Sequence, residues 1–335
     1  NGNVYLINPN GILFTPSARV NVGGLVASAM PMADEDFLAG RLFFSGAGGS
    51  VVNEGRLEGR YVYLLGSEVE NRGTIAADDV ILTAGQKSIL IDEAAGGEIR
   101  LVLDGEDEGE VIVSGEDLGD ALEDLDGEDV ASADPLDPGV TVEDVLESRV
   151  SNLGDIDATG GGAVRIEAST VEQTGTITAE QDVILEGTLT VGGTTESLSG
   201  GVIMIGHSPL IVAADVIAAE DITLTASELD EAGDDLTVNA GITVQSTGGS
   251  VILQAGDNII LQAGSIIDAN MTLSAEAGFE DLDGLGGQVI EGSLTAGDSI
   301  DLSAVEDISI AAPQSTAGTP FSAQGVNFSN SGGAI

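Results

Sequence analysis

The chain has 335 residues and a composition that excludes several classes of protein. Its formal net charge is −48, with 9 Lys and Arg against 57 Asp and Glu. This balance excludes sequence-independent binding to nucleic acid or to an anionic membrane, because both require a basic surface. Cys and Trp are absent, so neither disulfide bonds nor a thick aromatic core can stabilise the fold. No run of 18 apolar residues occurs, and we expect no membrane-spanning helix.

Two short apolar runs, at residues 2–7 and 13–14, flank the motif Asn8-Pro9-Asn10-Gly11-Ile12. Asn-Pro and Asn-Gly are turn dipeptides. Pro9 fixes its own φ and favours an extended Asn8, while Asn10 and Gly11 tolerate the left-handed conformation that a tight corner needs. The pattern predicts a strand, a sharp corner and a second strand.

This corner motif and residues 18–28 (Ala-Arg-Val-Asn-Val-Gly-Gly-Leu-Val-Ala-Ser) closely resemble the secretion domain of two-partner secretion exoproteins. These are the filamentous-haemagglutinin-like adhesins of Gram-negative bacteria. The resemblance is dense over residues 1–85 and thinner to about residue 190. It implies a right-handed parallel β-helix that an outer-membrane two-partner secretion transporter exports to the cell surface or beyond. The family's domain begins upstream of this motif, so we expect the chain to be N-terminally incomplete.

An internal repeat predicts the same architecture without the family. A template recurs at intervals of 18 to 22 residues: Gly or a small residue, any residue, Ile, Leu or Val, any residue, Ala, a short polar gap and then Val-x-Leu-x-Ala. This is one coil of a parallel β-solenoid, since a propeller blade is about twice as long. We expect Leu57, Ile75, Ile156 and Ile177 to stack inside. Residues 1–200 would form part of the secretion domain, and residues 201–335 would add further coils and a tail.

Asn53, Asn71 and Asn152 recur at equivalent places in the repeat, each followed two residues later by Gly. An inward-facing Asn at a corner can hydrogen-bond the Asn of the next coil and form a ladder. The alternative is an ordinary Asn-Gly type of surface turn. We expect the ladder, with Asn53 and Asn71 as its best-supported rungs.

The repeat is interrupted at residues 104–149, of which residues 104–147 hold 18 acids and no Lys or Arg. Apolar residues at helical spacing predict a helix-bearing excursion packed on the side of the solenoid. Asp124, Asp126 and Asp129 lie around a Gly as calcium ligands do, although the EF-hand spacing is not met. Weak calcium binding is one interpretation, and a solvated acidic face is the one we favour.

Catalytic signals are absent from the sequence, and we expect no catalytic residue, no cofactor and no enzyme activity. The single histidine, His207, has Ser208 and Asp215 near it in sequence, but this spacing does not indicate a triad. The first functional hypothesis is therefore a secreted or cell-surface adhesin with an unidentified host or neighbouring-cell ligand. The second is a filament subunit that forms a homopolymer by end-to-end stacking. A polysaccharide-active β-helix enzyme is a distant third.

Overall fold

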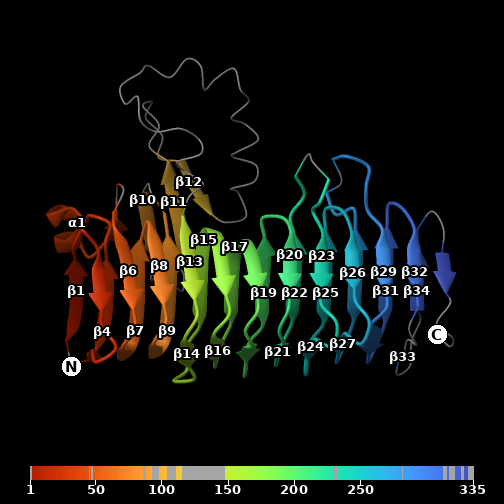
Figure 1. Cartoon of the computed structure of the whole chain (residues 1–335), viewed down its shortest axis with the longest axis horizontal. Helices are drawn as coiled ribbons and strands as arrows, with labels where there is room; N and C mark the ends of the chain where they lie inside the picture. The colour runs from red at the N-terminus through yellow and green to blue at the C-terminus, as the bar shows by residue number, and fades with distance from the viewer. Residues whose placement is uncertain are drawn as a thin grey trace, which may run out of the picture.

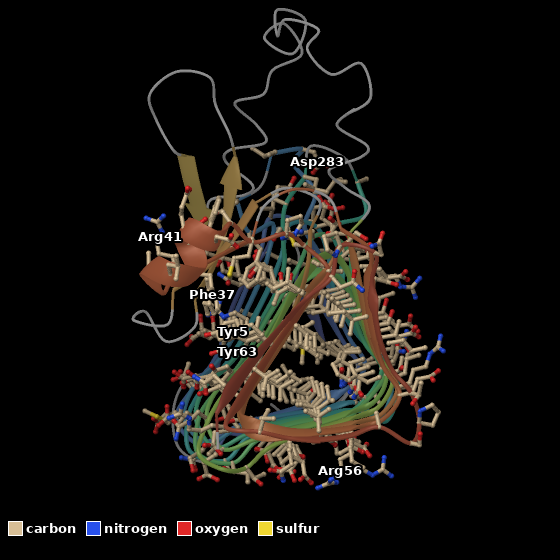
Figure 2. The ribbon with its side chains drawn as sticks, turned by 90° about the vertical axis from the view of Figure 1, so that its left-hand side faces the viewer. Tyr5, Phe37, Arg41, Arg56, Tyr63 and Asp283 are labelled. Atoms are coloured by element: carbon tan, nitrogen blue, oxygen red, sulfur yellow. The ribbon has the colours of Figure 1, made fainter. Side chains whose placement is uncertain are left out.

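The computed structural model describes residues 2–44, 46, 48–85, 88–92, 98–103, 111–114, 148–229, 232–280, 282–311, 315–316, 321–325 and 328–330. Side chains are not described for residues 88–92, 98–103, 111–114, 315–316 and 328–330. The chain winds into one elongated rod, with the two termini at opposite ends (Figure 1). A view along the rod shows a triangular cross-section that apolar side chains fill (Figure 2). The predicted parallel β-helix is thereby confirmed.

The strands of the described coils belong to one parallel sheet of 31 strands, which wraps around the rod as three faces. Each strand pairs in parallel with the strand one coil away. Face A consists of β3 (Arg19–Asn21), the first part of β7 (Arg56–Gly66) and of β9 (Thr74–Ala84), β14 (Asp155–Ala158), β16 (Thr176–Ala179), β18 (Thr195–Ser197), β21 (Val216–Ala218), β24 (Thr243–Ser246), β27 (Ile266–Ala269), β30 (Ser293–Ala296) and β33 (Ser315–Thr316).

Face B consists of β1 (Asn3–Ile7), β4 (Gly24–Ser28), the second part of β7 and β9, the first part of β15 (Val164–Gln173) and of β17 (Val183–Val191), β19 (Val202–Gly206), β22 (Ile222–Ala226), β25 (Val251–Ala255), β28 (Leu273–Ala277), β31 (Ile300–Ala304) and β34 (Phe321–Gln324). Face C consists of β2 (Ile12–Phe14), β6 (Ser50–Asn53), β8 (Glu68–Asn71), β13 (Arg149–Asn152), the second part of β15 and β17, β20 (Leu210–Val212), β23 (Leu236–Val238), β26 (Ile259–Leu261), β29 (Gln288–Ile290), β32 (Ile308–Ile310) and β35 (Phe328–Asn330).

The core is built from columns of inward side chains that repeat once per coil. Leu57 pairs with Ile75, Ile75 with Ile156, and Ile156 with Ile177, as predicted, and all four side chains are buried. Burying each such side chain contributes roughly 1.5–3 kcal/mol, and β-branched residues suit the pleated wall. The alternation of inward apolar and outward polar residues therefore fixes the register of every coil.

A short helix, α1 (Asp34–Ala39), interrupts the second coil and was not predicted, because only the acidic excursion was expected to contain helix. Three acids occupy its first turn, where their negative charges interact favourably with the positive end of the helix dipole. Gly40 ends it in the left-handed conformation with φ 72°. Phe37 of α1 packs edge-on against Tyr5 with ring centres 5.3 Å apart, which fixes the helix against face B.

A second, antiparallel sheet shows that the chain leaves the coil earlier than residue 104. It consists of β5 (Leu42–Phe44), β10 (Ser88–Asp92), β11 (Glu98–Leu103) and β12 (Val111–Ser114), in the order β12-β11-β10-β5. The predicted boundary was wrong because an alternating strand looks alike in sequence whether it pairs within a coil or outside it. The predicted helices of the excursion lie outside the described residues.

Phe44 and Leu42 of β5 cover a small second hydrophobic core on the outer side of face B. They pack with Tyr63, Leu65 and Ile81 and with other side chains that point outward from the coils. Figure 2 shows Tyr5, Tyr63 and Phe37 together on this side of the rod. The described ranges contain no helix with the length and apolar character that a membrane crossing requires.

Candidate functional site: the NPNGI corner and the asparagine ladder

The motif Asn8-Pro9-Asn10-Gly11-Ile12 forms the corner that joins β1 on face B to β2 on face C. The backbone N–H of Gly11 donates to the carbonyl oxygen of Asn8 at 2.9 Å, which closes the turn. The Asn8 side chain clamps the corner from outside: Nδ2 donates to the Gly11 carbonyl at 2.9 Å, and Oδ1 accepts from the backbone N–H of Asn10 at 3.2 Å. One side chain thus satisfies two backbone groups that no strand can pair.

Gly11 is the residue of this corner that takes a positive φ, at +107°. A Cβ atom at this position would lie 3.0 Å from the carbonyl oxygen of Ser50 in the next coil. Pro9 is held to the same coil, since its carbonyl accepts from the N–H of Gly49 at 2.9 Å. The corner is therefore rigid and stacked on its neighbour, while Asn8, Pro9 and Asn10 remain exposed to a partner.

Asn53, Asn71 and Asn152 stack at the end of face C with fully buried side chains. Asn53 Nδ2 donates to Asn71 Oδ1 at 2.8 Å, and Asn71 Nδ2 donates to Asn152 Oδ1 at 2.8 Å. Asn152 Nδ2 continues to Gln173 Oε1 at 2.8 Å, and Gln173 Nε2 donates to the Gly175 carbonyl at 2.9 Å. The structure thus holds a four-rung ladder, of which sequence reasoning missed Gln173.

Apolar residues terminate this ladder at both ends. Phe14 pairs with Asn53 in the coil before it, and Val191 pairs with Gln173 in the coil after it. The ladder consequently stabilises only the coils around the excursion, where β13 must rejoin β8 after the chain has left the solenoid. The Gly that follows two residues after Asn53, Asn71, Asn152 and Gln173 was the signal that could have identified the fourth rung.

The same corner carries a column of glycines that stack from coil to coil: Gly55, Gly73, Gly154, Gly175 and Gly193. A Cβ atom would lie 2.1 Å from the carbonyl oxygen of the preceding glycine at Gly73 and at Gly154, and 1.8 Å from it at Gly175. No side chain fits at such distances, so the backbones approach as closely as glycine allows. Sequence reasoning placed glycine at the first position of the repeat template but did not predict the column.

All nine basic residues lie at or before Arg165, and residues 166–335 contain 25 Asp and Glu and no Lys or Arg. Several arginines of the first coils pair with acids on the surface. Arg72 contacts Glu70 at 2.6 Å and Glu54 at 3.3 Å, and Arg56 contacts Glu58. The hydrogen bond from Arg56 lowers the pKa of Glu58 below its ordinary value. Exposed pairs of this kind contribute little stability, because water and salt screen them.

The residues around the single histidine do not form a catalytic triad. His207 Nε2 lies 3.6 Å from Oε1 of the buried Glu186, whereas Ser208 donates instead to Asp234. Asp215 lies at a different corner, where its side chain accepts from the N–H of Thr243 at 2.8 Å. A nucleophile and a base that contact different partners cannot relay a proton to one another.

The calcium candidates Asp124, Asp126 and Asp129 lie outside the described residues. Within the described ranges, no three His, Asp or Glu side chains are placed so that they could hold a metal ion. The calcium interpretation therefore stays a prediction about the excursion.

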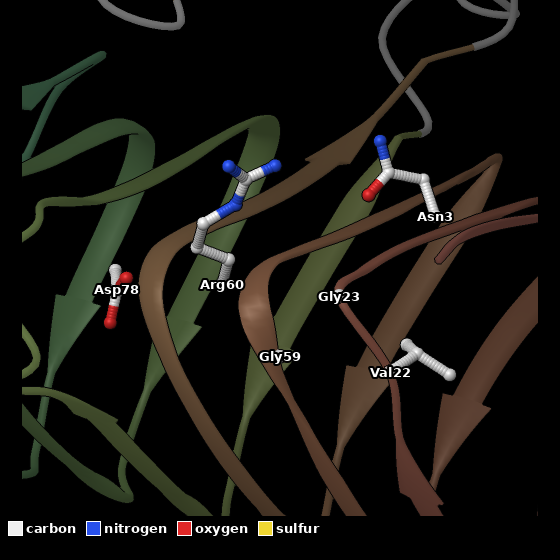
Figure 3. Close-up of a pocket in the computed structure, with 6 residues that line it drawn as sticks. All are labelled: Asn3, Val22, Gly23, Gly59, Arg60 and Asp78. Atoms are coloured by element: carbon white, nitrogen blue, oxygen red, sulfur yellow. The ribbon is translucent and has the colours of Figure 1, made fainter. Parts of the chain in front are cut away.

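Two shallow hollows lie on the surface of the described coils. The first has about 470 Å³ and is shown in Figure 3, and the second has about 330 Å³ and lies over β24, β27 and β30. In the first, Arg60 and Asp78 point in different directions, and the Arg60 guanidinium lies 5.9 Å from the centre of the Tyr61 ring. The first is lined by Asn3, Val22, Gly23, Gly59, Arg60 and Asp78. Neither hollow brings together an acid, a base and a nucleophile.

Residues 1–125 match the family model of the TPS secretion domain. Among solved structures, the HMW1 secretion domain from Haemophilus influenzae matches with a TM-score of 0.54 and 19% sequence identity, over 96% of this chain and 80% of that chain. At this identity the structural match shows the fold alone. No curated protein matches the chain in sequence.

The resemblance drawn from the NPNGI motif is thereby confirmed, and residues 1–125 carry the TPS secretion domain of two-partner secretion exoproteins. A TPS secretion domain marks its chain for export and implies that an outer-membrane TpsB transporter is its partner.

Proposed function

We propose that this exoprotein is a secreted or cell-surface β-helical adhesin, which the transporter recognises at the NPNGI corner and which attaches to a surface through its later coils. The rigid, exposed corner within the matched secretion domain is the observation that supports the first part. The exposed side chains of Asn8 and Asn10 are the groups that a partner strand or loop would contact.

Co-expression with the cognate transporter tests the recognition step. Secretion of wild type should exceed that of Asn8→Ala at least tenfold, while Asn270→Ala, which removes a weaker corner bond at 3.4 Å, should be secreted like wild type. Equal secretion of Asn8→Ala would place recognition elsewhere. Reduced secretion of Asn8→Ala could arise from misfolding or from a recognition defect. Circular dichroism of the purified variant distinguishes the two causes.

Attachment is tested with purified protein on intact bacterial and epithelial cells. Saturable binding that an excess of unlabelled protein displaces supports an adhesin. Absence of binding to both cell types, with secretion intact, would refute attachment while leaving the export assignment standing.

End-to-end assembly is the second candidate, because a parallel β-helix presents strand edges at its ends. Among the described residues, β1, β2 and β3 each pair on one side only, with β4, β6 and β7. Electron microscopy separates the candidates: rods of a single length support the adhesin, and fibres of indefinite length support a filament subunit.

A further inference from the structure

Two outward loops meet at the corner between faces B and C, in the part of the rod that lacks basic residues. The first, which we call the Glu228 loop, comprises the described residues 227–229 and 232–235 between β22 and β23. The second, the Leu282 loop, comprises residues 282–287 before β29. Figure 2 shows Asp283 at the outer edge of this corner, away from the triangular core.

Hydrogen bonds to carboxylates hold the two loops in place. The N–H of Leu282 donates to Glu228 Oε1 at 3.4 Å, which ties one loop to the other. The N–H of Leu229 donates to Asp234 Oδ2 at 2.5 Å. Asp257, in the short turn between the loops, accepts from the N–H of Asp234 at 3.1 Å. The attachment of both loops therefore depends on acidic side chains.

Two oxygens of this cluster are buried without a hydrogen-bond partner among the described residues: Oε2 of Glu228 and Oδ1 of Asp257. Asp257 is only 1% exposed and Asp234 only 3% exposed. No Lys or Arg exists anywhere in residues 166–335 to compensate their charge. Buried carboxylates without a cation are costly, and the cost falls when one of them takes up a proton.

Burial raises the pKa of Glu228 to about 7 and outweighs the hydrogen bond from Leu282, which acts to lower it, while the charges of Asp234, Asp257 and Asp283 add to the rise. Burial also raises the pKa of Asp234. These three acids are the charged groups that face Glu228 in the described residues. In the neighbouring turns lie His207, which faces Glu186, and Glu280, Glu306 and Asp307. Asp230, Glu231 and Asp281 lie outside the described residues.

We propose that the Glu228, Asp234 and Asp257 cluster is a proton-dependent latch, which holds the Leu282 loop against the Glu228 loop when Glu228 is protonated and releases it when Glu228 ionises. A proton on Oε2 removes the uncompensated charge and converts an unpartnered acceptor into a donor. A proton fits this site better than a metal ion, because no three of its described side chains are placed to hold one. Leu282, which is 53% exposed, would move away from Glu228 on release.

The absence of Trp from the chain provides a direct test. Leu282→Trp places a single fluorophore on the latch, and Met271→Trp, at a corner between faces A and B, is the control. We expect the Leu282→Trp emission to titrate with a midpoint near neutral pH, with the closed-to-open ratio changing about tenfold per pH unit. The Met271→Trp emission should stay constant over the same range.

Glu228→Gln in the Leu282→Trp background should remove the transition and keep the closed emission from about pH 5 to about pH 9, because the neutral amide cannot ionise. An unchanged titration in this double variant, or no titration in the single variant, would overturn the latch. Calcium added at about pH 8 should leave the open emission unchanged. Restoration of the closed emission by calcium would reassign the cluster to cation binding and overturn the proton latch. Far-ultraviolet circular dichroism of each variant establishes that the solenoid is intact.

Discussion

At the scale of single residues, the secretion corner depends on one backbone conformation. Gly11→Val should destabilise the fold by about 1–2 kcal/mol, because φ +107° is unfavourable for a β-branched residue and the new Cβ approaches the Ser50 carbonyl at 3.0 Å. Chemical denaturation measures this change, and co-expression with the transporter measures secretion, which should also fall.

Gly2→Val is the matched control for this substitution, since, apart from the chain neighbours of Gly2, no atom of the described residues lies within 4 Å of its Cβ position. It should leave stability and secretion as they are. If Gly11→Val behaved like Gly2→Val, the strain assigned to the corner would be refuted.

Asn71, an inner rung of the ladder, should be among the most sensitive of the buried polar residues. Asn71→Ala leaves Asn53 Nδ2 without an acceptor and Asn152 Oδ1 without a donor. Each buried, unpaired group costs about 1–3 kcal/mol, so we expect a loss of about 2–5 kcal/mol in the free energy of unfolding. The exposed Asn21, which bonds Glu58, supplies the control Asn21→Ala, for which a loss below about 1 kcal/mol is expected. Similar losses for both variants would contradict a special role of the ladder.

Glu228 should make stability depend on pH in a defined direction. Its pKa rises from 4.5 in the unfolded chain to about 7 in the fold, so the folded state binds the proton more tightly. Its contribution is therefore most favourable below pH 4.5 and is lost as pH rises through 7. Chemical denaturation across this pH range should show that the free energy of unfolding decreases as pH rises. The decrease per pH unit should be smaller in Glu228→Gln. Equal slopes would show that other carboxylates dominate.

At the scale of elements, coils pack against each other through glycine as well as through apolar columns. The loops between faces C and A approach so closely that the carbonyl oxygen of each stacked glycine occupies the space that a Cβ on the glycine of the next coil would need. The ladder and the glycine column lie at this same corner, so polar and steric complementarity together fix the spacing of β8, β13 and β15.

Gly154→Ala tests this contact, because its Cβ would lie 2.1 Å from the Gly73 carbonyl oxygen. The backbones must move apart, and overpacking of this kind costs about 1–3 kcal/mol. Gly192→Ala is the control, since its nearest contact would be a Thr174 methyl group at 3.3 Å. Thermal melting compares the two variants, and a Gly154→Ala protein as stable as Gly192→Ala would show that the corner tolerates side chains.

At the scale of the whole molecule, charge is distributed unevenly along the rod. All Lys and Arg residues lie at or before Arg165. Residues 166–335 contain Asp and Glu but no Lys or Arg. Acids also meet in register, as Glu167 does with Glu186. Paired strands lie about 4.8 Å apart, which is within the screening length of about 10 Å at 0.1 M salt, so acids on adjacent coils repel one another.

Sodium chloride should accordingly raise the melting temperature of the chain, with most of the gain below about 0.5 M, where screening changes fastest. Potassium chloride should act equally if screening is the cause. A melting temperature that stays constant across both series would show that the net charge of −48 does not limit stability.

The sequence by itself determined the solenoid, its period and its core columns. These features repeat locally, and a side-chain period of two assigns each residue to the inside or the outside without knowledge of its partner. Leu57, Ile75, Ile156 and Ile177 could be placed for this reason. The corner at Asn8 to Ile12 could be placed because turn chemistry is local as well.

Only the tertiary structure decided which separate segments meet. The pairing of β5 with β10 joins Phe44 to Ile89 across a long stretch of chain, and no local signal encodes it. The Gln173 rung and the glycine column depend on which coil lies above which. The raised pKa of Glu228 arises because folding buries it beside Asp234 and Asp257, whereas in sequence it is one acid among 57. Burial and long-range pairing are properties of the assembled coils, and a linear pattern cannot specify them.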